Sequence, residues 1–595
     1  MKHSLFAAAI YLLVGPACLA APLVQNPHAR EGISLDGEWA RIVDPYENGY
    51  YNHRFEPHEQ GYFSNLKQQT PSELIEYNFA SSPRLQVPGD WNTQEQALFF
   101  YEGTVWYQRD FSLQKRPGRK YLIHFGAVNY AAIVFVNGRL VGRHEGGFTP
   151  FQFDVSDQLV DGENFVVVKA DNRRERDNVP TVNTDWWNYG GITRSVRILD
   201  VPAHHLSDYA LFLGENGRVK GWAQVTGPAG ELGLRIADLG VNQVVEIDHQ
   251  GRGQISLDVK PNTWSPDTPV LYDIRLEYNG EIVKDRIGFR KIEVAGPEIL
   301  LNGRPMFLKG ISLHEEKPDG DGRAWSEAHA RRLLGWVKEL GANFVRLAHY
   351  PHNENMLRVA DELGLLVWSE IPVYWTVDFA DTRVFAKAET QLSEMISRDR
   401  NRASVVLWSI ANETPAGTDR LEFLTRLADT ARKLDPTRLV TAALDTQSDT
   451  GGGKLIDDPL SSVVDVIGIN SYCGWYGGTP ESCANMAWHS KYGKPVIMSE
   501  FGAGALRGNH GPADHRWTEE YQAAVYRYNL EMIDRITFLR GMAPWILKDF
   551  RSPRRPLPGI QDYWNRKGLL SETGEKKASW QLLRTYYEKR AGSSP

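Results

Sequence analysis

The sequence predicts a multidomain chain: an all-β jelly-roll sandwich, then an immunoglobulin-like β-sandwich, then a C-terminal TIM (β/α)8 barrel. Three observations predict this order. The 595 residues are too many for one hydrophobic core. The first half consists of short strand-like runs separated by Gly, Pro and Asp. The second half alternates apolar strand runs with amphipathic helical runs, and eight such units in ~300 residues are typical of a TIM barrel.

The first 20 residues, "MKHSLFAAAIYLLVGPACLA", have a basic start and an apolar stretch from Leu5 to Val14. They predict a secretory signal peptide with cleavage after Ala20, and therefore a periplasmic or secreted protein. Cys18 could instead carry a lipid, but the three residues before it make a poor lipidation signal. No later run approaches the ~18 apolar residues that span a bilayer, so we expect no membrane partner.

Residues 21–203 read as the jelly roll. The run "AAIVFVNGRLVGR" (Ala131 to Arg143) joins two apolar segments through Asn137-Gly138, a strong hairpin signal. Residues 204–295 form a second all-β unit, with alternating segments such as "GRVKGWAQVTG" and "LYDIRLEYNG". The size of this unit fits an immunoglobulin-like sandwich.

Residues 296–595 read as the barrel. The expected strands are "PMFLKGISLH", "NFVRLAHYP", "LLVWSEIP", "SVVLWSIANE", "RLVTAALD", "VVDVIGINSY", "PVIMSEFG" and "LRGMAPWILKDF". Helices between them should end at Gly341 and Gly364. In this fold the active site forms at the carboxyl ends of the strands. Those ends supply His314, Arg346, His349, Glu370, Asn412, Glu413, Asn470, Tyr472, Glu500 and Trp545.

Two glutamates stand out among these residues. Glu413 ends the fourth expected strand and Glu500 ends the seventh, so the two should face each other across the barrel mouth. Cleavage of a glycosidic bond needs one protonated and one ionised carboxyl group. A single Glu at a strand end is more often an ion-pair partner. The pair, together with 18 Trp whose exposed rings often line sugar sites, favours catalysis.

The chain resembles glycoside hydrolase family 2 over nearly its whole mature length. The resemblance rests on "NFVRLAHYPHNENMLRVADELGLLVWSEIP" (Asn343 to Pro372), "WSIANE" and "MSEFG". It implies that Glu413 is the acid/base and Glu500 the nucleophile of a retaining double displacement. It also implies that Asn412 binds the 2-hydroxyl of the sugar. Members of the family often form dimers or tetramers, so a homo-oligomer is compatible with this resemblance.

The stretch "YWNRKG" (Tyr563 to Gly568) bears on the substrate. β-Glucuronidases of the family carry Asn-x-Lys-Gly, whose Asn and Lys grip the substrate carboxylate, and Asn565 and Lys567 match it. A uronic acid differs from its neutral hexose by one negative charge, and a charge-assisted contact contributes ~1.5–3 kcal/mol. The same letters also suit a surface turn. The resemblance implies a secreted exo-β-glucuronidase that acts on β-D-glucuronosyl units of glycosides or acidic oligosaccharides.

Four further residues resemble pocket residues of the family. Asp185 in "TDWWNYGGI" matches a jelly-roll loop that touches the distal hydroxyls of the sugar. Tyr472 and Tyr476 in "NSYCGWY" match pocket tyrosines, and Tyr472 is expected to contact Glu500. Trp545 is expected to stack on an apolar face of the sugar.

One stretch departs from the family pattern. Glucuronidases commonly read N-F-A-D-F after the tryptophan of the eighth strand, whereas this chain reads "ILKDF". Lys548, Arg551, Arg554 and Arg555 add positive charge, which could assist the carboxylate or bind a second acidic unit. A β-galacturonidase or β-galactosidase therefore stays open. A carbohydrate-binding protein without catalysis is the non-enzymatic alternative, and the intact glutamate pair argues against it.

The net charge, the histidine spacing and the cysteine count bear on partners, metals and disulfides. The net charge of −7 gives no basic surface for nucleic acid. His314, His349 and His352 lack the spacing of a zinc motif, and we expect hydrogen-bonding roles for them, no metal and no cofactor. After removal of the leader, Cys473 and Cys483 remain, either as a disulfide or as two free thiols.

Overall fold

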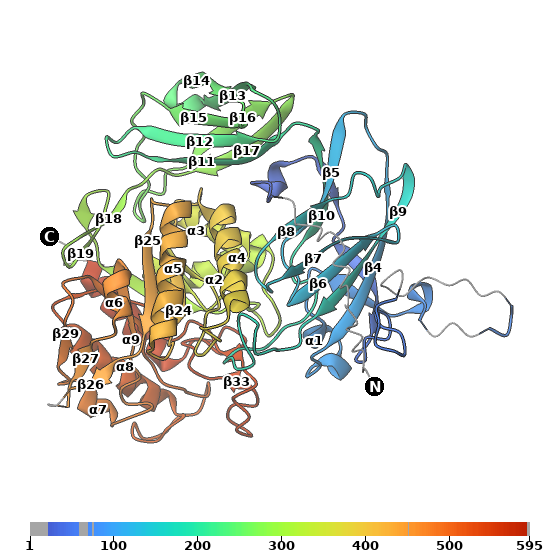
Figure 1. Cartoon of the computed structure of the whole chain (residues 1–595). Helices are drawn as coiled ribbons and strands as arrows, with labels where there is room; N and C mark the ends of the chain where they lie inside the picture. The colour runs from blue at the N-terminus through green and yellow to red at the C-terminus, as the bar shows by residue number, and fades with distance from the viewer. Residues whose placement is uncertain (1–21, 59–69, 74–76, 450–451, 592–595) are drawn as a thin grey trace, which may run out of the picture.

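The computed structural model describes residues 22–58, 70–73, 77–449 and 452–591 (Figure 1). The predicted signal peptide lies outside the described residues. Three units follow one another along the chain, and they are those that the sequence predicts. No helix within the described part of the chain combines the length and apolarity that a membrane span requires.

The jelly roll is built from two antiparallel sheets. The larger sheet has the order β3 (Arg84–Val87), β2 (Gly37–Val43), β4 (Thr104–Leu113), β9 (Gly162–Asp171), β6 (Ala131–Val136), β7 (Arg139–Glu145). The smaller has the order β1 (Gly32–Ser34), β10 (Val196–Pro202), β5 (Arg119–Phe125), β8 (Phe151–Asp154). The predicted hairpin is confirmed: Asn137 and Gly138, with φ of 48° and 79°, join β6 to β7. These positive angles match the twist of the two strands.

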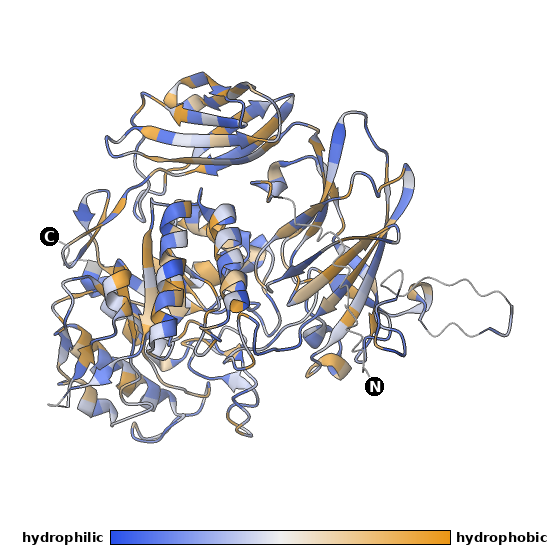
Figure 2. Cartoon of the chain, viewed as in Figure 1, coloured by the Kyte–Doolittle hydropathy of each residue, from blue (hydrophilic) through white to orange (hydrophobic). Residues whose placement is uncertain are grey.

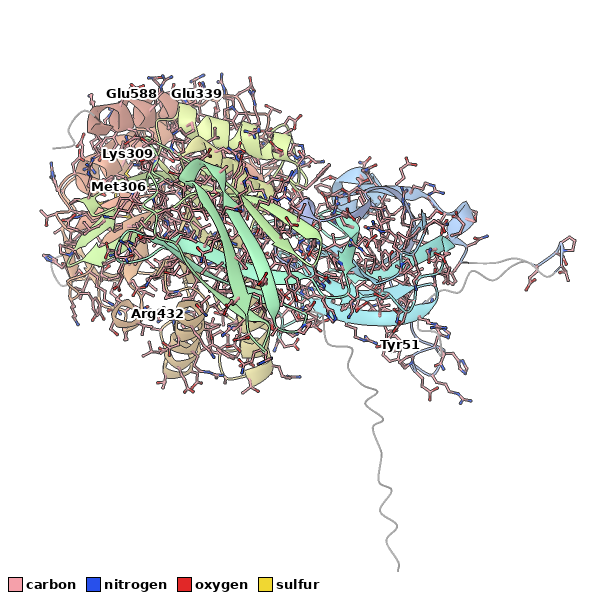
Figure 3. All side chains as sticks on the ribbon, turned by 90° about the horizontal axis from the view of Figure 1, so that it is seen from above. Tyr51, Met306, Lys309, Glu339, Arg432 and Glu588 are labelled. Atoms are coloured by element: carbon pink, nitrogen blue, oxygen red, sulfur yellow. A yellow bond between two sulfur atoms is a disulfide. The ribbon has the colours of Figure 1, made fainter. Side chains whose placement is uncertain are left out.

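The immunoglobulin-like unit is a second sandwich, which lies above the barrel in Figure 1 and faces the viewer in Figure 3. One sheet has the order β11 (Leu206–Leu213), β12 (Val219–Val225), β15 (Arg252–Ser256). The other has the order β14 (Val241–Ile247), β13 (Gly230–Ile236), β16 (Tyr272–Tyr278), β17 (Glu281–Ile287). Side chains of β12 and β16 alternate between buried and more exposed, as the two-residue period predicts.

The C-terminal unit is a closed barrel of eight parallel strands, and each predicted strand is present. Its order is β21 (Leu308–Leu313), β22 (Phe344–Leu347), β23 (Leu366–Glu370), β24 (Val405–Asn412), β25 (Leu439–Leu444), β28 (Val466–Asn470), β30 (Val496–Glu500), β31 (Leu539–Met542). A small sheet of β18 (Ile292–Ala295), β19 (Glu298–Leu301) and β20 (Arg304–Pro305) precedes it and spans the expected boundary at residue 296. The predicted domain limits stay predictions.

Helices surround the barrel and turn their apolar faces toward it. The long ones are α2 (Glu327–Glu339), α3 (Glu354–Leu363), α4 (Thr382–Asp399), α5 (Thr418–Leu434), α8 (Glu519–Ile533) and α9 (Ala578–Ala591). Figure 2 shows hydrophilic and hydrophobic residues on the same ribbon in α4 and α5, as expected for helices half covered by the barrel. The predicted stops are confirmed, because Gly341 and Gly364 have φ of 82° and 66° just beyond α2 and α3.

Short helices and strands lie outside the main sheets of the barrel and the jelly roll. They are α1 (Trp91–Gln94), α6 (Leu460–Val463), α7 (Pro480–Cys483), β26 (Gln447–Ser448), β27 (Lys454–Ile456), β29 (Trp488–Ser490), β32 (Phe550–Arg551) and β33 (Trp564–Asn565). The strands β32 and β33 pair with each other. This pairing folds the segment after the eighth barrel strand back over the barrel mouth.

Contacts between the jelly roll and the barrel fix one jelly-roll loop at the mouth. Arg194 forms a buried ion pair with Glu315 (Nη2–Oε2 3.1 Å), and the Tyr189 hydroxyl donates to Glu316 (2.9 Å). The Trp187 amide donates to the carbonyl of Arg551 (3.0 Å). Buried charge-assisted bonds of this kind resist separation, because breaking one leaves a charge uncompensated. The loop that carries Asp185 is therefore held against the barrel.

The tryptophans behave differently from the expectation of exposed sugar-binding rings. Seven of them, Trp39, Trp91, Trp106, Trp264, Trp368, Trp408 and Trp580, are among the largest fully buried side chains. None of the 18, all of which lie in the described ranges, is exposed. Most lie in the apolar clusters of the jelly roll and of the barrel, which explains their number. The inference from tryptophan count to exposed sugar-site rings was wrong, although two of these rings, Trp375 and Trp545, line the pocket described next.

Candidate active site

A cavity of about 730 Å³ opens at the carboxyl ends of the barrel strands, within the size range of small-molecule sites. It is lined by the predicted site residues Asp185, His349, Glu413, Tyr472, Tyr476, Glu500, Trp545 and Lys567. Asn412 and Asn565 are buried and form hydrogen bonds to the lining residues Asn470 and Asp185, respectively. Residues far apart in sequence thus converge on one site because the barrel collects strand ends at one face.

Glu500 is the last residue of β30, and its carboxylate receives two strong hydrogen bonds. Arg346 donates from Nη1 to Oε1 at 2.7 Å, and the Tyr472 hydroxyl donates to Oε2 at 2.5 Å. The predicted contact between Tyr472 and Glu500 is confirmed. A buried guanidinium and a phenol O–H thus hold the carboxylate in place by short hydrogen bonds.

Glu413 directly follows β24, and its side chain is held differently. Asn470 donates from Nδ2 to Oε1 and Trp375 donates from Nε1 to Oε2, both at 2.8 Å. Burial, then the charges of Glu500 and Asp445, raise the pKa of Glu413 to about 7. The site thus contains one carboxyl group that is about half protonated at neutral pH and one that is paired with arginine. Two carboxyl groups in such different environments divide acid and nucleophile roles between them.

The backbone at Glu413 is unusual, with φ of 47°. Residues other than glycine rarely adopt this left-handed conformation, and it costs ~1–3 kcal/mol where it persists. Here the surrounding contacts enforce it: the Glu413 amide donates to the carbonyl of Ala443 at 2.9 Å. This conformation aims the carboxyl group into the cavity.

Arg346, from β22, connects the acidic groups below the cavity. It is fully buried (0% exposed) and donates from Nη2 to Asn412 Oδ1 (2.6 Å) and to Glu370 Oε1 (3.2 Å). Although burial raises the pKa of Glu370, Arg346 and His349 bring it down to about 2. Glu370 in turn binds His349 Nδ1 at 2.7 Å. This network fixes both the nucleophile candidate and the floor of the pocket.

Two of the predicted sugar contacts lie on this network. The ring of Trp545 stacks on His349, with centroids 4.8 Å apart. Asn412 uses its Oδ1 to accept from Arg346 and from Asn470 Nδ2 (3.3 Å). Its buried Nδ2 has no hydrogen-bond partner among the described residues. Because buried polar groups are nearly always paired, this N–H is suited to a ligand hydroxyl.

Lys567 places a cation in the wall of the cavity. The side chain is 4% exposed, and its Nζ donates to the Tyr476 hydroxyl at 2.9 Å. Its Nζ also lies 5.4 Å from the ring centre of Tyr472 and 5.0 Å from that of Tyr476. Among the described residues no carboxylate pairs with it. A buried charge without a counter-ion is costly, so this ammonium suits an anionic ligand.

Asp185 enters the cavity from the jelly roll and is held by three donors. Arg555 forms a two-pronged ion pair with it (Nε–Oδ1 3.0 Å), and Ser552 donates at 2.5 Å. Asn565 donates from Nδ2 to Oδ2 at 3.2 Å. The Asn565 amide, which is 1% exposed, therefore orients Asp185. A direct grip of Asn565 on a ligand carboxylate stays a prediction.

The four basic residues after the eighth strand separate into two pairs. Lys548 donates to the carbonyl of Gly320 at 2.8 Å, and Arg551 forms an ion pair with Asp321 at 2.9 Å. Neither lines the cavity, so neither can assist a bound carboxylate there. Arg554 and Arg555 do line it.

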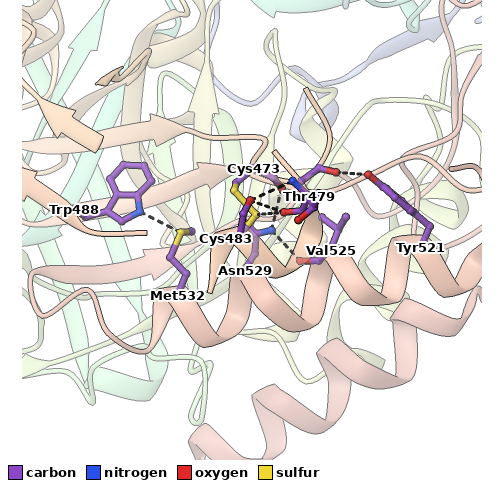
Figure 4. Close-up of a disulfide and its surroundings, with 10 residues drawn as sticks. Cys473, Thr479, Cys483, Trp488, Tyr521, Val525, Asn529 and Met532 are labelled. Carbon is purple, nitrogen blue, oxygen red and sulfur yellow. Dashed lines mark hydrogen bonds between the residues drawn. A yellow bond between two sulfur atoms is a disulfide. The ribbon is translucent and has the colours of Figure 1, made fainter. Parts of the chain in front are cut away.

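Cys473 and Cys483 form a disulfide, with their Cα atoms 5.8 Å apart (Figure 4). The bond closes a loop that carries Tyr476, the partner of Lys567. Figure 4 also shows Asn529 and Tyr521 around this loop. The Tyr521 hydroxyl donates to the carbonyl of Gly474 at 2.6 Å. Of the two alternatives from the sequence, the structure has the disulfide.

The histidines near the mouth have ordinary hydrogen-bond partners. His314 Nδ1 lies 3.1 Å from the Tyr350 hydroxyl, and His352 Nε2 lies 2.9 Å from the carbonyl of Ala348. Within the part of the chain that the structure describes, no three His, Cys, Asp or Glu side chains are grouped as metal ligands.

Sequence reasoning placed Arg346 and Asn470 among the polar residues near strand ends but gave them no role. In the structure Arg346 lies in β22 and binds Glu500, and Asn470 ends β28 and binds Glu413. Trp375 lies five residues beyond β23 in "VYWTV", where no sequence pattern sets it apart. The same holds for Ser552, whose contact with Asp185 joins two units.

Comparisons with known proteins agree with this architecture. A family model described as the TIM barrel domain of glycosyl hydrolases family 2 matches residues 292–590, and one described as the sugar binding domain of that family matches residues 33–202. A β-glucuronidase from Paenibacillus borealis is 29% identical over 561 residues, which cover 84% of this chain and 91% of the relative.

Two solved structures extend the comparison. The structure of a β-glucuronidase from an uncultured Clostridium is similar with a TM-score of 0.81 at 27% identity, covering 96% of this chain and 100% of that one. A β-galacturonidase from Eisenbergiella tayi bound to galacturonate is similar with a TM-score of 0.78 at 26% identity, covering 94% of this chain and 98% of that one.

Proposed function

The chain belongs to glycosyl hydrolases family 2 and is a glycoside hydrolase, and from that membership we propose that it is a retaining exo-β-glucuronidase. It removes terminal β-D-glucuronosyl units from glycosides. Relatives that carry the name β-glucuronidase and match most of the chain support this proposal.

One observation supports the uronic acid more than any other: the buried ammonium of Lys567 in the cavity wall, with no carboxylate partner among the described residues. A neutral sugar would leave this charge uncompensated, whereas the carboxylate of a uronic acid would compensate it. The Tyr476 hydroxyl beside it adds a second polar group. Although burial raises the pKa of Tyr476, Lys567 and Arg555 lower it below its usual value, which is the effect of local positive potential.

The reaction proceeds in two displacements. In the first, a Glu500 carboxylate oxygen attacks the anomeric carbon, while Glu413 donates its proton to the glycosidic oxygen and the aglycone leaves as an alcohol. In the second, Glu413, now ionised, takes a proton from water as that water attacks the anomeric carbon. The bond to Glu500 breaks, the free sugar leaves with its original anomeric configuration, and both glutamates return to their starting states.

The other residues hold the sugar for this chemistry. The free N–H of Asn412 binds the 2-hydroxyl, where hydrogen bonds strengthen in the transition state. Trp545, fixed by its stack on His349, supports an apolar face of the ring. Asp185, held by Arg555, accepts from hydroxyls at the far end of the sugar. Closure by Asp185 at this end favours removal of single terminal units.

A β-galacturonidase is the second candidate. Glucuronate and galacturonate carry the same carboxylate and differ in the orientation of one hydroxyl. Lys567 would therefore bind the carboxylate of either sugar. The similarity to a galacturonate-bound β-galacturonidase supports it. A β-galactosidase is less favoured, because a neutral sugar does not compensate Lys567.

We also propose that the protein is exported. The N-terminal 20 residues have the pattern of a cleaved leader, and a disulfide suits an oxidising compartment. Sequencing of the mature N-terminus should find Ala21 first. A mature chain that still begins at Met1 would contradict export by cleavage.

Initial rates on the nitrophenyl β-glycosides of glucuronate, galacturonate, glucose and galactose test the proposed function. We expect turnover of the glucuronide to exceed that of both neutral glycosides. Faster turnover of the galacturonide would favour the second candidate, and faster turnover of a neutral glycoside would overturn both. The anomer formed first, followed by proton NMR, should be β for a retaining enzyme and α for an inverting one.

A further inference from the structure

The leaving group of the reaction must lie against Glu413, because that carboxyl group gives it a proton. Trp375 marks this place. Its indole N–H donates to Glu413 Oε2 at 2.8 Å, and the residue lines the same cavity. The surface around Trp375 therefore contacts the unit on the far side of the scissile bond from the glucuronosyl residue.

Arg554 covers this surface. Its guanidinium carbon lies 4.8 Å from the ring centre of Trp375, and its Nη1 donates to Asn183 Oδ1 at 2.5 Å. It lines the cavity and, among the described residues, forms no ion pair. Its neighbour Arg555, by contrast, is neutralised by Asp185. Arg554 is thus held by an aromatic ring and an amide in the lining of the cavity.

The charged side chains that line the cavity include positive charges that no carboxylate of the described residues neutralises. Glu500 is paired with Arg346. Asp185 is paired with Arg555. The pKa values of the remaining acidic lining residues, Glu413 and Asp445, are raised, mainly by burial, which disfavours their ionised forms. Lys454 also lines the cavity and has no ion pair within the described ranges.

We propose that Arg554, held over Trp375, forms a leaving-group subsite that selects an anionic sugar unit next to the scissile bond. The proposal rests on the proposed β-glucuronidase function and adds the class of substrate: acidic oligosaccharides rather than neutral glycosides. A planar guanidinium held in place matches a carboxylate in two-pronged geometry and loses little freedom on binding. The ring of Trp375 beneath it keeps the guanidinium in place.

Matched disaccharides test the subsite. One has a glucuronosyl unit β-linked to a uronate and the other has the same linkage to the corresponding neutral hexose. We expect kcat/KM of the wild-type protein to be about three- to tenfold higher on the acidic disaccharide. This ratio lies between those that an exposed ion pair and a charge-assisted hydrogen bond would produce. The preference should shrink at 0.5 M salt, because screening weakens an exposed charge pair.

Variants then assign the preference. Arg554→Gln should bring the ratio of the two substrates close to one, and Arg554→Lys, which keeps the charge, should restore part of it. Arg304→Gln removes another exposed positive charge, on β20 and outside the cavity lining, and should leave the ratio unchanged.

The outcomes separate the two proposals. If wild type does not hydrolyse nitrophenyl β-glucuronide, the proposed function fails and the subsite fails with it. If that substrate is hydrolysed but the acidic disaccharide is not preferred, the subsite alone is overturned. A preference that survives in Arg554→Gln also overturns it.

Discussion

The indole N–H of Trp375 donates to Oε2 of Glu413 at 2.8 Å. This bond stabilises the ionised form of a carboxyl group whose pKa burial and Glu500 raise to about 7. Asn470 acts in the same direction from the other oxygen. The proton affinity of Glu413 is therefore a balance between an environment that favours the proton and two donors that oppose it.

The first prediction concerns this balance. The first displacement needs Glu413 protonated, so kcat/KM should fall as pH rises through about 7. Trp375→Phe removes a donor to the ionised form and should move this alkaline limb to higher pH. Full pH profiles of kcat/KM on nitrophenyl β-glucuronide measure the shift. Trp325→Phe, outside the cavity, is the control, and an unmoved or lowered limb in Trp375→Phe would contradict the assignment.

The second prediction links Glu413 to stability. Its pKa is raised from an ordinary 4.5 to about 7, so the folded protein holds a proton that the unfolded chain releases between these values. The stabilisation is complete below pH 4.5 and lost as pH rises through 7. Glu413→Gln stays neutral throughout. The Tm of Glu413→Gln minus that of wild type should therefore be larger at pH 8 than at pH 5, and an equal difference at both would refute the raised pKa.

The third prediction assigns the two glutamates. Glu500→Gln removes the nucleophile and should abolish turnover. Glu413→Ala should lose most activity, and azide should restore part of it on substrates with good leaving groups, because a small anion can enter the space and attack the glycosyl–enzyme intermediate. The product of rescue should be the β-glycosyl azide by NMR. If azide instead restores activity to the position 500 variant and has no effect on the position 413 variant, Glu413 is the nucleophile and Glu500 the acid/base.

The fourth prediction concerns the disulfide. Joining Cys473 and Cys483 closes a loop of about ten residues, which in the chain-entropy model contributes at most ~3 kcal/mol to the free energy of unfolding. The double variant Cys473→Ser/Cys483→Ser should lower Tm and also release Tyr476 from Lys567. We expect kcat/KM to fall more on the glucuronide than on the neutral glucoside. An equal fall on both would mean that the loop serves stability alone.

The large divisions of this fold could be predicted because their signals are local. Alternating or continuous apolar runs specify strands, and glycines at 341 and 364 specify helix ends. The order of strands around the barrel follows from the order along the chain. This is why Glu413 and Glu500 could be placed in one site from two short motifs.

Other features depend on contacts that no local pattern encodes. The exposure of a tryptophan depends on which unit covers it, so the count of 18 misled. The contact of Asn565 with Asp185 is an example, because Asp185 comes from the jelly roll and no local pattern pairs the two residues. Trp375 and Arg554 meet only because a loop after the third barrel strand and one after the eighth cross at the mouth.

The measurement that tests the central claim most directly is the selectivity of Lys567→Met. Methionine keeps the packing against Tyr472 and Tyr476 but removes the charge, and loss of a ~1.5–3 kcal/mol contact predicts a ten- to 150-fold fall in kcat/KM on nitrophenyl β-glucuronide. Activity on the β-glucoside should stay the same or rise, and Lys433→Met, on the exposed face of α5, should change neither. Full glucuronidase activity in Lys567→Met, or an equal loss on both substrates, would contradict the claim that this buried ammonium selects a uronic acid.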